Sequence, residues 1–356
     1  MKKNIISILA FSMLSYNIAY SQTVVPIPNT IAQHEGAVRV AIIRNLCTDE
    51  STMQFVTGAV EEGHKLGFDV SVFYAQCDNT RFQDLVNQAI AQKYDGIILS
   101  YGKAPYASRM VKRIVAAGIK LSLFETPVDV PVKGVTMTSQ DDGSLAQLSM
   151  GQLIRDFNGK ANIIKLWVAG YPPMERRQVI YEKLLKENPG INQLESMGAV
   201  TSNIPNDTAE KMNAILAKYP KGKIDAIWGS WDAFSQGAYK ALKDNDRNEI
   251  KLYSVDISNR DLQMMVEKNS PWVLSVAVNQ RTVGAVNMRL IALKIGGEAT
   301  PETYEFKAAA ISQAQLKSHQ EAINVDSLNK IIPGWGENRD FIAPWFATLQ
   351  AKYANK

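Results

Sequence analysis

Two successive series of alternating strand and helix signals constrain the fold of this chain more than any other feature. In the first series, β-branched runs at residues 38–43, 69–74, 96–99 and 120–124 are separated by amphipathic stretches at 53–66, 81–92 and 106–117. Strands that alternate with helices in this way predict a parallel sheet with helices on both faces.

The same alternation then begins again after residue 144 and continues to residue 295. Helical stretches at 145–156, 175–187, 208–219, 233–243, 261–268 and 281–295 alternate with strand signals at 162–168, 193–200, 226–228, 251–255 and 273–278. The 356 residues also exceed what one ordinary core supports. We therefore expect an α/β protein with two doubly wound parallel-sheet lobes. Ligands of such sheets bind beyond the carboxyl ends of the strands, so a site is expected in the cleft between the lobes.

The first residues of the sequence have the order of a secretory signal peptide. Lys2 and Lys3 form a positive start, residues 5–18 are mostly apolar, and Ala19 and Ser21 supply the small residues of a cleavage site. The apolar stretch is shorter than the roughly 20 residues that a membrane span needs. We expect residues 1–21 to be a signal peptide cleaved after Ser21, and the mature protein to be soluble in the periplasm.

Composition and motifs argue against several classes of function. Hydrophobic residues make up 46% of the chain and charged residues 21%, as in ordinary globular proteins. The net charge of +4 is dispersed, so no basic stripe for nucleic acid is present. The sequence contains no P-loop, no G-x-S-x-G and no strand-linked G-x-G-x-x-G, and its three histidines are far apart. Asp141 and Asp142 are adjacent and are expected to cap a helix. We expect no enzyme, no metal and no cofactor.

The run GYPPMERRQVIY at residues 170–181 resembles the periplasmic ribose-type (type I) sugar-binding proteins of ABC importers. Further segments resemble that family in the same order, at residues 95–100, 121–125, 224–232 and 253–256. The similarity extends from about residue 38 to residue 310. It implies the type I periplasmic binding protein fold, in which a three-strand hinge joins the two lobes.

The resemblance also implies a division of the chain and a function. The N-terminal lobe should hold residues 37–125 and 280–309, and the C-terminal lobe residues 126–279 and 310–356. The chain would cross between them near Thr126, Val278 and Ala310. The implied function is capture of a sugar, polyol or sugar acid by hinge closure for the membrane permease of an ABC importer. The alternative is a ligand sensor that docks on a membrane histidine kinase or chemoreceptor.

Carried over by position, the resemblance gives a set of candidate ligand-binding residues. Arg177 and Asp256 match the family's binding arginine and acid, while Trp231 could stack on the sugar or belong to the core. Removing Arg177 or Asp256 should therefore weaken binding with little effect on folding. The full candidate set is Asp49, Lys103, Glu125, Arg177, Trp231, Asp256 and Asn279.

Two departures from the family pattern concern the ligand. The stacking aromatic residues usual in the first loop, near Asp49, are missing. Lys103 lies where ribose binders carry an acid, so it would suit a ligand with a carboxylate or would pair with Glu125. Glu125 itself could contact the ligand or make a hydrogen bond in the hinge.

Cys47 and Cys77 each lie just past the carboxyl end of a predicted strand, the first and second of the first lobe. Neighbouring parallel strands lie about 4.8 Å apart, so the two loops could bring the cysteines within bridging distance. An exported protein meets an oxidising environment. A Cys47–Cys77 disulfide and two buried free thiols are both open.

Overall fold

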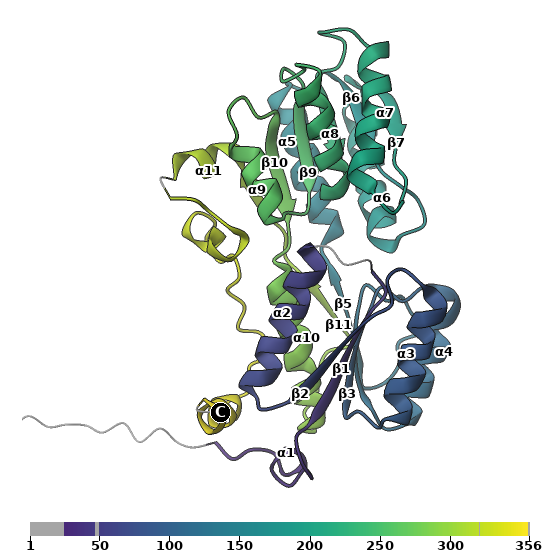
Figure 1. Ribbon diagram of the computed structural model, residues 1–356, viewed down its shortest axis with the longest axis vertical. Helices are drawn as coiled ribbons and strands as arrows, with labels where there is room; N and C mark the ends of the chain where they lie inside the picture. Colours follow the sequence, from purple (N-terminus) through teal and green to yellow (C-terminus); the bar gives the residue numbers. More distant parts are fainter. Residues whose placement is uncertain (1–24, 47–49, 320, 355–356) are drawn as a thin grey trace, which may run out of the picture.

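The computed structural model describes residues 25–46, 50–319 and 321–354. Two six-stranded sheets form two lobes that lie one above the other (Figure 1). The strand orders are β11-β5-β4-β3-β1-β2 and β12-β10-β9-β8-β6-β7. All described strand pairs are parallel except β10 with β12. The prediction of two doubly wound α/β lobes is confirmed.

The first lobe is a sheet covered by two pairs of helices. Its strands are β1 (Arg39–Arg44), β2 (Asp69–Tyr74), β3 (Gly96–Ser100), β4 (Lys120–Phe124), β5 (Val135–Gln140) and β11 (Thr303–Phe306). Helices α2 (Glu50–Lys65) and α10 (Gln280–Ile295) lie on one face, and α3 (Asn79–Ala91) and α4 (Ala104–Ala116) on the other (Figure 1). Because both faces are covered, the middle residues of β1 are fully buried, which explains their β-branched, apolar sequence.

Close packing of α2 against α10 depends on two glycines. A Cβ atom at Gly58 would lie 1.9 Å from the carbonyl oxygen of Arg281, and one at Gly284 would lie 1.9 Å from that of Phe55. The two backbones therefore touch where any larger residue would force them apart. This contact fixes the amino-terminal half of α2, which carries Phe55 beneath the carboxyl ends of β1 and β4.

The second lobe repeats the arrangement. Its strands are β6 (Ala161–Leu166), β7 (Ile191–Met197), β8 (Ala226–Gly229), β9 (Lys251–Val255), β10 (Trp272–Ala277) and β12 (Ala309–Ser312). Helices α5 (Asp142–Asp156) and α6 (Pro172–Glu187) pack on one face, and α7 (Ile204–Lys218), α8 (Asp232–Asp244) and α9 (Asn259–Val266) contribute to the core on the other. The first turn of α9 is closed by a capping box between Ser258 and Asp261.

The chain passes between the sheets at three points of the hinge. It leaves β5 for α5 at Asp141, leaves β10 for α10 at Val278 and Asn279, and leaves β11 for β12 at residues 307–308. The expected crossing near Thr126 is wrong, because β5 pairs in register with β4 and belongs to the first sheet. Residues 126–140 are therefore part of the first lobe.

The C-terminal segment contacts both lobes. Helix α11 (Gln313–Ser318) and the 3-10 helix η1 (Val325–Lys330) join the core of the second lobe, together with Trp335. Helix α12 (Phe346–Tyr353) returns to the first lobe and packs near α2 (Figure 1). The expectation that residues 310–356 lie wholly with the second lobe is wrong for this last part, because the apolar side chains of Phe346 and Leu349 are buried in the first.

No helix among the described residues is both long enough and apolar enough to cross a membrane.

Candidate functional site

Left-handed backbone marks the carboxyl ends of three strands. Tyr101 follows β3 with φ of 61°, Glu125 follows β4 with 48°, and Asp256 follows β9 with 71°. Such conformations cost a non-glycine residue roughly 1–3 kcal/mol and gather at functional sites. The first two belong to one lobe and the third to the other, so the strain lies at the ends of the sheets from which a ligand would be reached.

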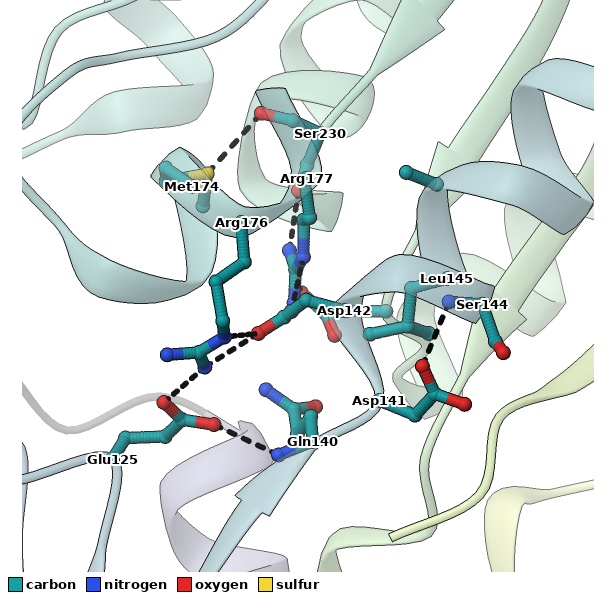
Figure 2. Close-up of polar contacts among 12 residues, drawn as sticks. Glu125, Gln140, Asp141, Asp142, Ser144, Leu145, Met174, Arg176, Arg177 and Ser230 are labelled. Carbon is teal, nitrogen blue, oxygen red and sulfur yellow. Dashed lines mark hydrogen bonds and ion pairs between the residues drawn. The ribbon is translucent and has the colours of Figure 1, made fainter. Parts of the chain in front are cut away.

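Arg177 lies at the centre of the polar contacts on the second lobe (Figure 2). Only 1% of its side chain is exposed. Its Nε donates to Asp142 Oδ1 at 2.7 Å, and its Nη1 donates to the carbonyl oxygen of Ser230 at 2.5 Å and to Asp256 Oδ2 at 3.2 Å. Burial lowers the pKa of Arg177, but the carboxylates of Asp256 and Asp142 outweigh it and raise the pKa overall, so the guanidinium stays charged. Two residues singled out from the sequence, Arg177 and Asp256, thus lie in direct contact.

Arg176, the preceding residue of α6, joins the two lobes. Its Nη2 donates to Glu125 Oε2 on the first lobe at 2.5 Å and to Asp142 Oδ2 on the second at 2.5 Å (Figure 2). Glu125 Oε1 accepts from the backbone N–H of Gln140 at 2.8 Å. Glu125 therefore makes the hinge hydrogen bond that was one of its two expected roles, and its ion pair is with Arg176 instead of Lys103.

The adjacent acids at the start of α5 have different roles. Asp141 Oδ1 accepts from the backbone N–H of Ser144 at 2.8 Å, which is the expected capping contact. Asp142 is buried and accepts from both Arg176 and Arg177 (Figure 2). The expectation that Asp142 merely caps the helix is wrong, because two guanidinium groups from α6 converge on its carboxylate.

The buried carboxyl group of Glu125 has an altered acidity. Burial raises its pKa from 4.5 to about 7, the carboxylate of Asp142 adds to the rise, and Arg176 opposes it. Because the folded state holds the proton more tightly than the unfolded state, this group favours unfolding progressively as pH rises from about 4.5 to about 7.

We expect Glu125→Gln to remove that pH dependence. The free energy of unfolding of the variant, relative to the original protein, should increase between pH 5 and pH 7.5, as measured by urea unfolding at several pH values. Glu187→Gln, at a position 52% exposed at the end of α6, is the control. A difference between Glu125→Gln and the original protein that is constant across this range would contradict the assignment.

The remaining predicted site residues are placed as follows. Trp231 precedes α8, is half-buried, and packs edge-on against Phe234 at 5.6 Å between ring centroids. The exposed Lys103 holds its ammonium group 5.8 Å from the ring centre of Tyr171, on the opposite lobe. Asn279 caps α10 by accepting from the backbone N–H of Thr282 at 2.9 Å. Asp49 lies outside the described residues.

Several residues at this boundary were not predicted from the sequence. Arg176 makes the interlobe ion pair with Glu125, Asp142 pairs with Arg176 within the second lobe, and Ser230 supplies a carbonyl oxygen to Arg177. Arg44 ends β1 with 1% exposure and lies 4.1 Å over the ring of Phe55. The signal that could have identified Arg176 is the adjacent arginine pair in the first turns of α6, since both members can reach the carboxylates at the hinge.

Comparison with known proteins identifies the family. A model of the periplasmic binding protein domain matches residues 40–299. The crystal structure of a sugar ABC transporter protein from Yersinia enterocolitica subsp. enterocolitica 8081 is 62% identical and covers 93% of this chain and 99% of that chain, with a TM-score of 0.90. A 5-methylthioribose transporter solute binding protein from Thermotoga lettingae TMO, solved with 5-methylthioribose, is 29% identical over 88% of this chain and 99% of that chain, with a TM-score of 0.83.

A curated relative gives a more distant match. The D-apiose import binding protein of Paraburkholderia graminis is 25% identical over 253 residues, which are 70% of this chain and 79% of that protein. The domain match spans well over half of the chain, and the two-lobed architecture agrees with it. The chain therefore belongs to the periplasmic binding protein family, and its structural relatives include sugar ABC transporter binding proteins.

Proposed function

We propose that this protein captures a sugar or polyol between its two lobes and delivers it to the membrane permease of an ABC importer. The observation that carries the proposal is the convergence of charged side chains from both lobes at the strand ends. Glu125 comes from the first lobe, while Arg176, Arg177 and Asp256 come from the second. The protein binds its ligand without altering it, as the family's binding proteins do.

The chemistry of these groups suits a polyhydroxylated ligand. Each sugar hydroxyl both donates and accepts, so guanidinium forks and carboxylate oxygens can satisfy it together. Asp256 keeps 18% of its side chain exposed, so a ligand can reach its carboxylate. The half-buried indole of Trp231 could cover the apolar C–H face of a sugar ring.

Contacts across the lobe boundary link ligand binding to hinge closure. Arg176 pairs with Glu125, and Glu50 Oε1 accepts from the backbone N–H of Asn259 at 2.7 Å. A ligand held by both lobes adds further contacts that exist only when the lobes are close. Its differential affinity for that state shifts the hinge toward closure.

The relatives favour the importer over the sensor. The named proteins from Yersinia enterocolitica, Thermotoga lettingae and Paraburkholderia graminis are all transport or import proteins. A closed form recognised by a permease would complete the cycle. A location of the protein in the periplasm follows from the signal peptide proposed for residues 1–21, which lie outside the described residues.

A ligand screen tests the proposed function. We expect 5-methylthioribose, D-apiose or a related pentose to raise the melting temperature, because a ligand at 100 times its Kd stabilises the folded state by about 2.7 kcal/mol. Differential scanning fluorimetry with neutral sugars, polyols and matched sugar acids measures the shift. A larger shift with the acids would support a contact from Lys103. A panel that leaves the melting temperature unchanged at millimolar concentrations would refute sugar binding.

The Cys47–Cys77 disulfide remains a prediction, because Cys47 lies outside the described residues. Cys77 follows β2 with a left-handed φ of 63°. Closing a loop of about 30 residues would stabilise the fold by around 3–4 kcal/mol in the entropic model. We expect mass spectrometry of the exported protein to show both cysteines protected from alkylation unless a reductant is added first. Complete alkylation of both without reductant would rule the bridge out.

A further inference from the structure

Tyr101, the residue that follows β3, is held in place by an aromatic stack. Its ring packs edge-on against Phe124, with 5.6 Å between centroids, and Phe124 stacks on Phe55 at 5.4 Å. The guanidinium of Arg44 lies 4.1 Å from the ring centre of Phe55 and 5.5 Å from that of Tyr101. These four side chains form a packed layer at the carboxyl ends of β1, β3 and β4.

The backbone of Tyr101 is held in a conformation that tyrosine rarely adopts. Its φ of 61° is left-handed, and its N–H donates to the carbonyl oxygen of Phe124 at 3.0 Å. The next residue, Gly102, is anchored by a hydrogen bond from its N–H to Thr126 Oγ1 at 3.0 Å. A glycine or asparagine would adopt this backbone conformation with less strain. The advantage of tyrosine at this position must therefore come from its side chain.

Charged side chains of both lobes influence the phenol group of Tyr101. Its hydroxyl interacts electrostatically with Glu125 and Arg44 of the first lobe and with Asp256 and Arg177 of the second. Burial, followed by the Glu125 carboxylate, raises the pKa of Tyr101, so the hydroxyl keeps its proton. No group in the described part of the chain makes a hydrogen bond to this hydroxyl, although the residue is half-buried.

We propose that Tyr101 is a ligand-contacting residue that helps set sugar specificity: its hydroxyl donates to a ligand hydroxyl, and its ring borders the C–H face of the sugar. The proposal rests on the function proposed above. It gives a physical role to an aromatic side chain in a lobe whose first loop lacks stacking residues. The Tyr101 hydroxyl interacts electrostatically with Glu125 of one lobe and Asp256 of the other, so one phenol can serve a ligand that both lobes hold.

Two substitutions separate the contributions of the hydroxyl and the ring. Tyr101→Phe keeps the ring and should weaken binding by about 2- to 13-fold, as loss of one neutral hydrogen bond does. Tyr101→Asn removes the ring while tolerating the left-handed backbone, and should weaken binding more than Tyr101→Phe does. The probes are 5-methylthioribose and D-apiose, measured by isothermal titration calorimetry. Tyr94→Phe, a buried tyrosine at the opposite end of β3, is the matched control and should leave affinity unchanged.

The possible results distinguish this inference from the proposed function. A weaker Kd in Tyr101→Phe, with the melting temperature of the ligand-free protein unchanged, supports direct contact. If the original protein binds a probe and both Tyr101 variants bind it equally well, the inference is overturned while sugar binding stands. If the ligand-free melting temperature falls in Tyr101→Phe and affinity does not, the hydroxyl is structural. Failure of the original protein to bind either probe or any other sugar of the panel would overturn both.

Discussion

Arg177→Ala should destabilise the folded protein by about 3–5 kcal/mol, the cost of breaking a buried ion pair. The substitution leaves the fully buried carboxylate of Asp142 with Arg176 alone and takes a partner from Asp256. It also removes the donor to the carbonyl oxygen of Ser230. Urea unfolding in the absence of ligand measures the change. This prediction differs from the expectation drawn from the sequence, that folding would hardly depend on Arg177, because the side chain is buried instead of lying at an open edge.

Two controls make the Arg177 result interpretable. Arg155→Ala, on the exposed face of α5, should change stability by less than about 0.5 kcal/mol. Arg177→Lys keeps the charge but loses the planar fork, so it should recover only part of the loss. If Arg177→Ala unfolds at the same urea concentration as the original protein, the contacts with Asp142 and Ser230 do not support the fold.

Asp256→Asn should lower ligand affinity by about tenfold to over a hundredfold, with little effect on stability. A hydrogen bond to a charged group contributes about 1.5–3 kcal/mol, and each 1.4 kcal/mol is about tenfold in Kd. Asparagine has the same shape and tolerates the left-handed φ of 71° at this position. Arg177 would keep its contacts with Asp142 and Ser230, so the buried pair would survive.

Calorimetric titration with the sugar that gives the largest thermal shift measures the effect of Asp256→Asn. The matched control is Asp246→Asn, an exposed position after α8 with a similar left-handed φ of 56°. The control should bind as the original protein does. Unchanged affinity in Asp256→Asn would place its carboxylate outside the ligand contacts.

The candidate site was partly predictable from the sequence. Arg177, Asp256 and Glu125 were identified because the resemblance pointed to all three, and Asp256 and Glu125 also follow predicted strands. Arg176 and Asp142 were missed because their importance comes from partners far along the chain: Arg176 bonds a residue 51 positions away and Arg177 one 35 positions away. Nothing local distinguishes such residues from a solvated arginine or a helix cap.

Strand β5 is a part of the fold that likewise could not be predicted from the local sequence. Most buried parallel strands of this chain are apolar runs and were predicted, but β5 has the sequence VTMTSQ. Its buried Thr136 and Thr138 are satisfied by Pro301 O at 2.6 Å and by Leu123 O at 2.9 Å. Polar residues can fill a strand core only when such partners exist, and the local sequence does not reveal those partners.

The sequence by itself determined the α/β class, the repeat into two lobes and the strand ends where a site should lie. These follow from hydrophobic periodicity, which reflects burial of each element against its neighbours. Only the tertiary structure decided that β5 belongs to the first sheet, that the C-terminal segment returns to the first lobe, and that Arg176 joins Glu125 across the hinge. The physical reason is that burial patterns are local along the chain, whereas hydrogen bonds and ion pairs depend on which distant segments the fold brings together.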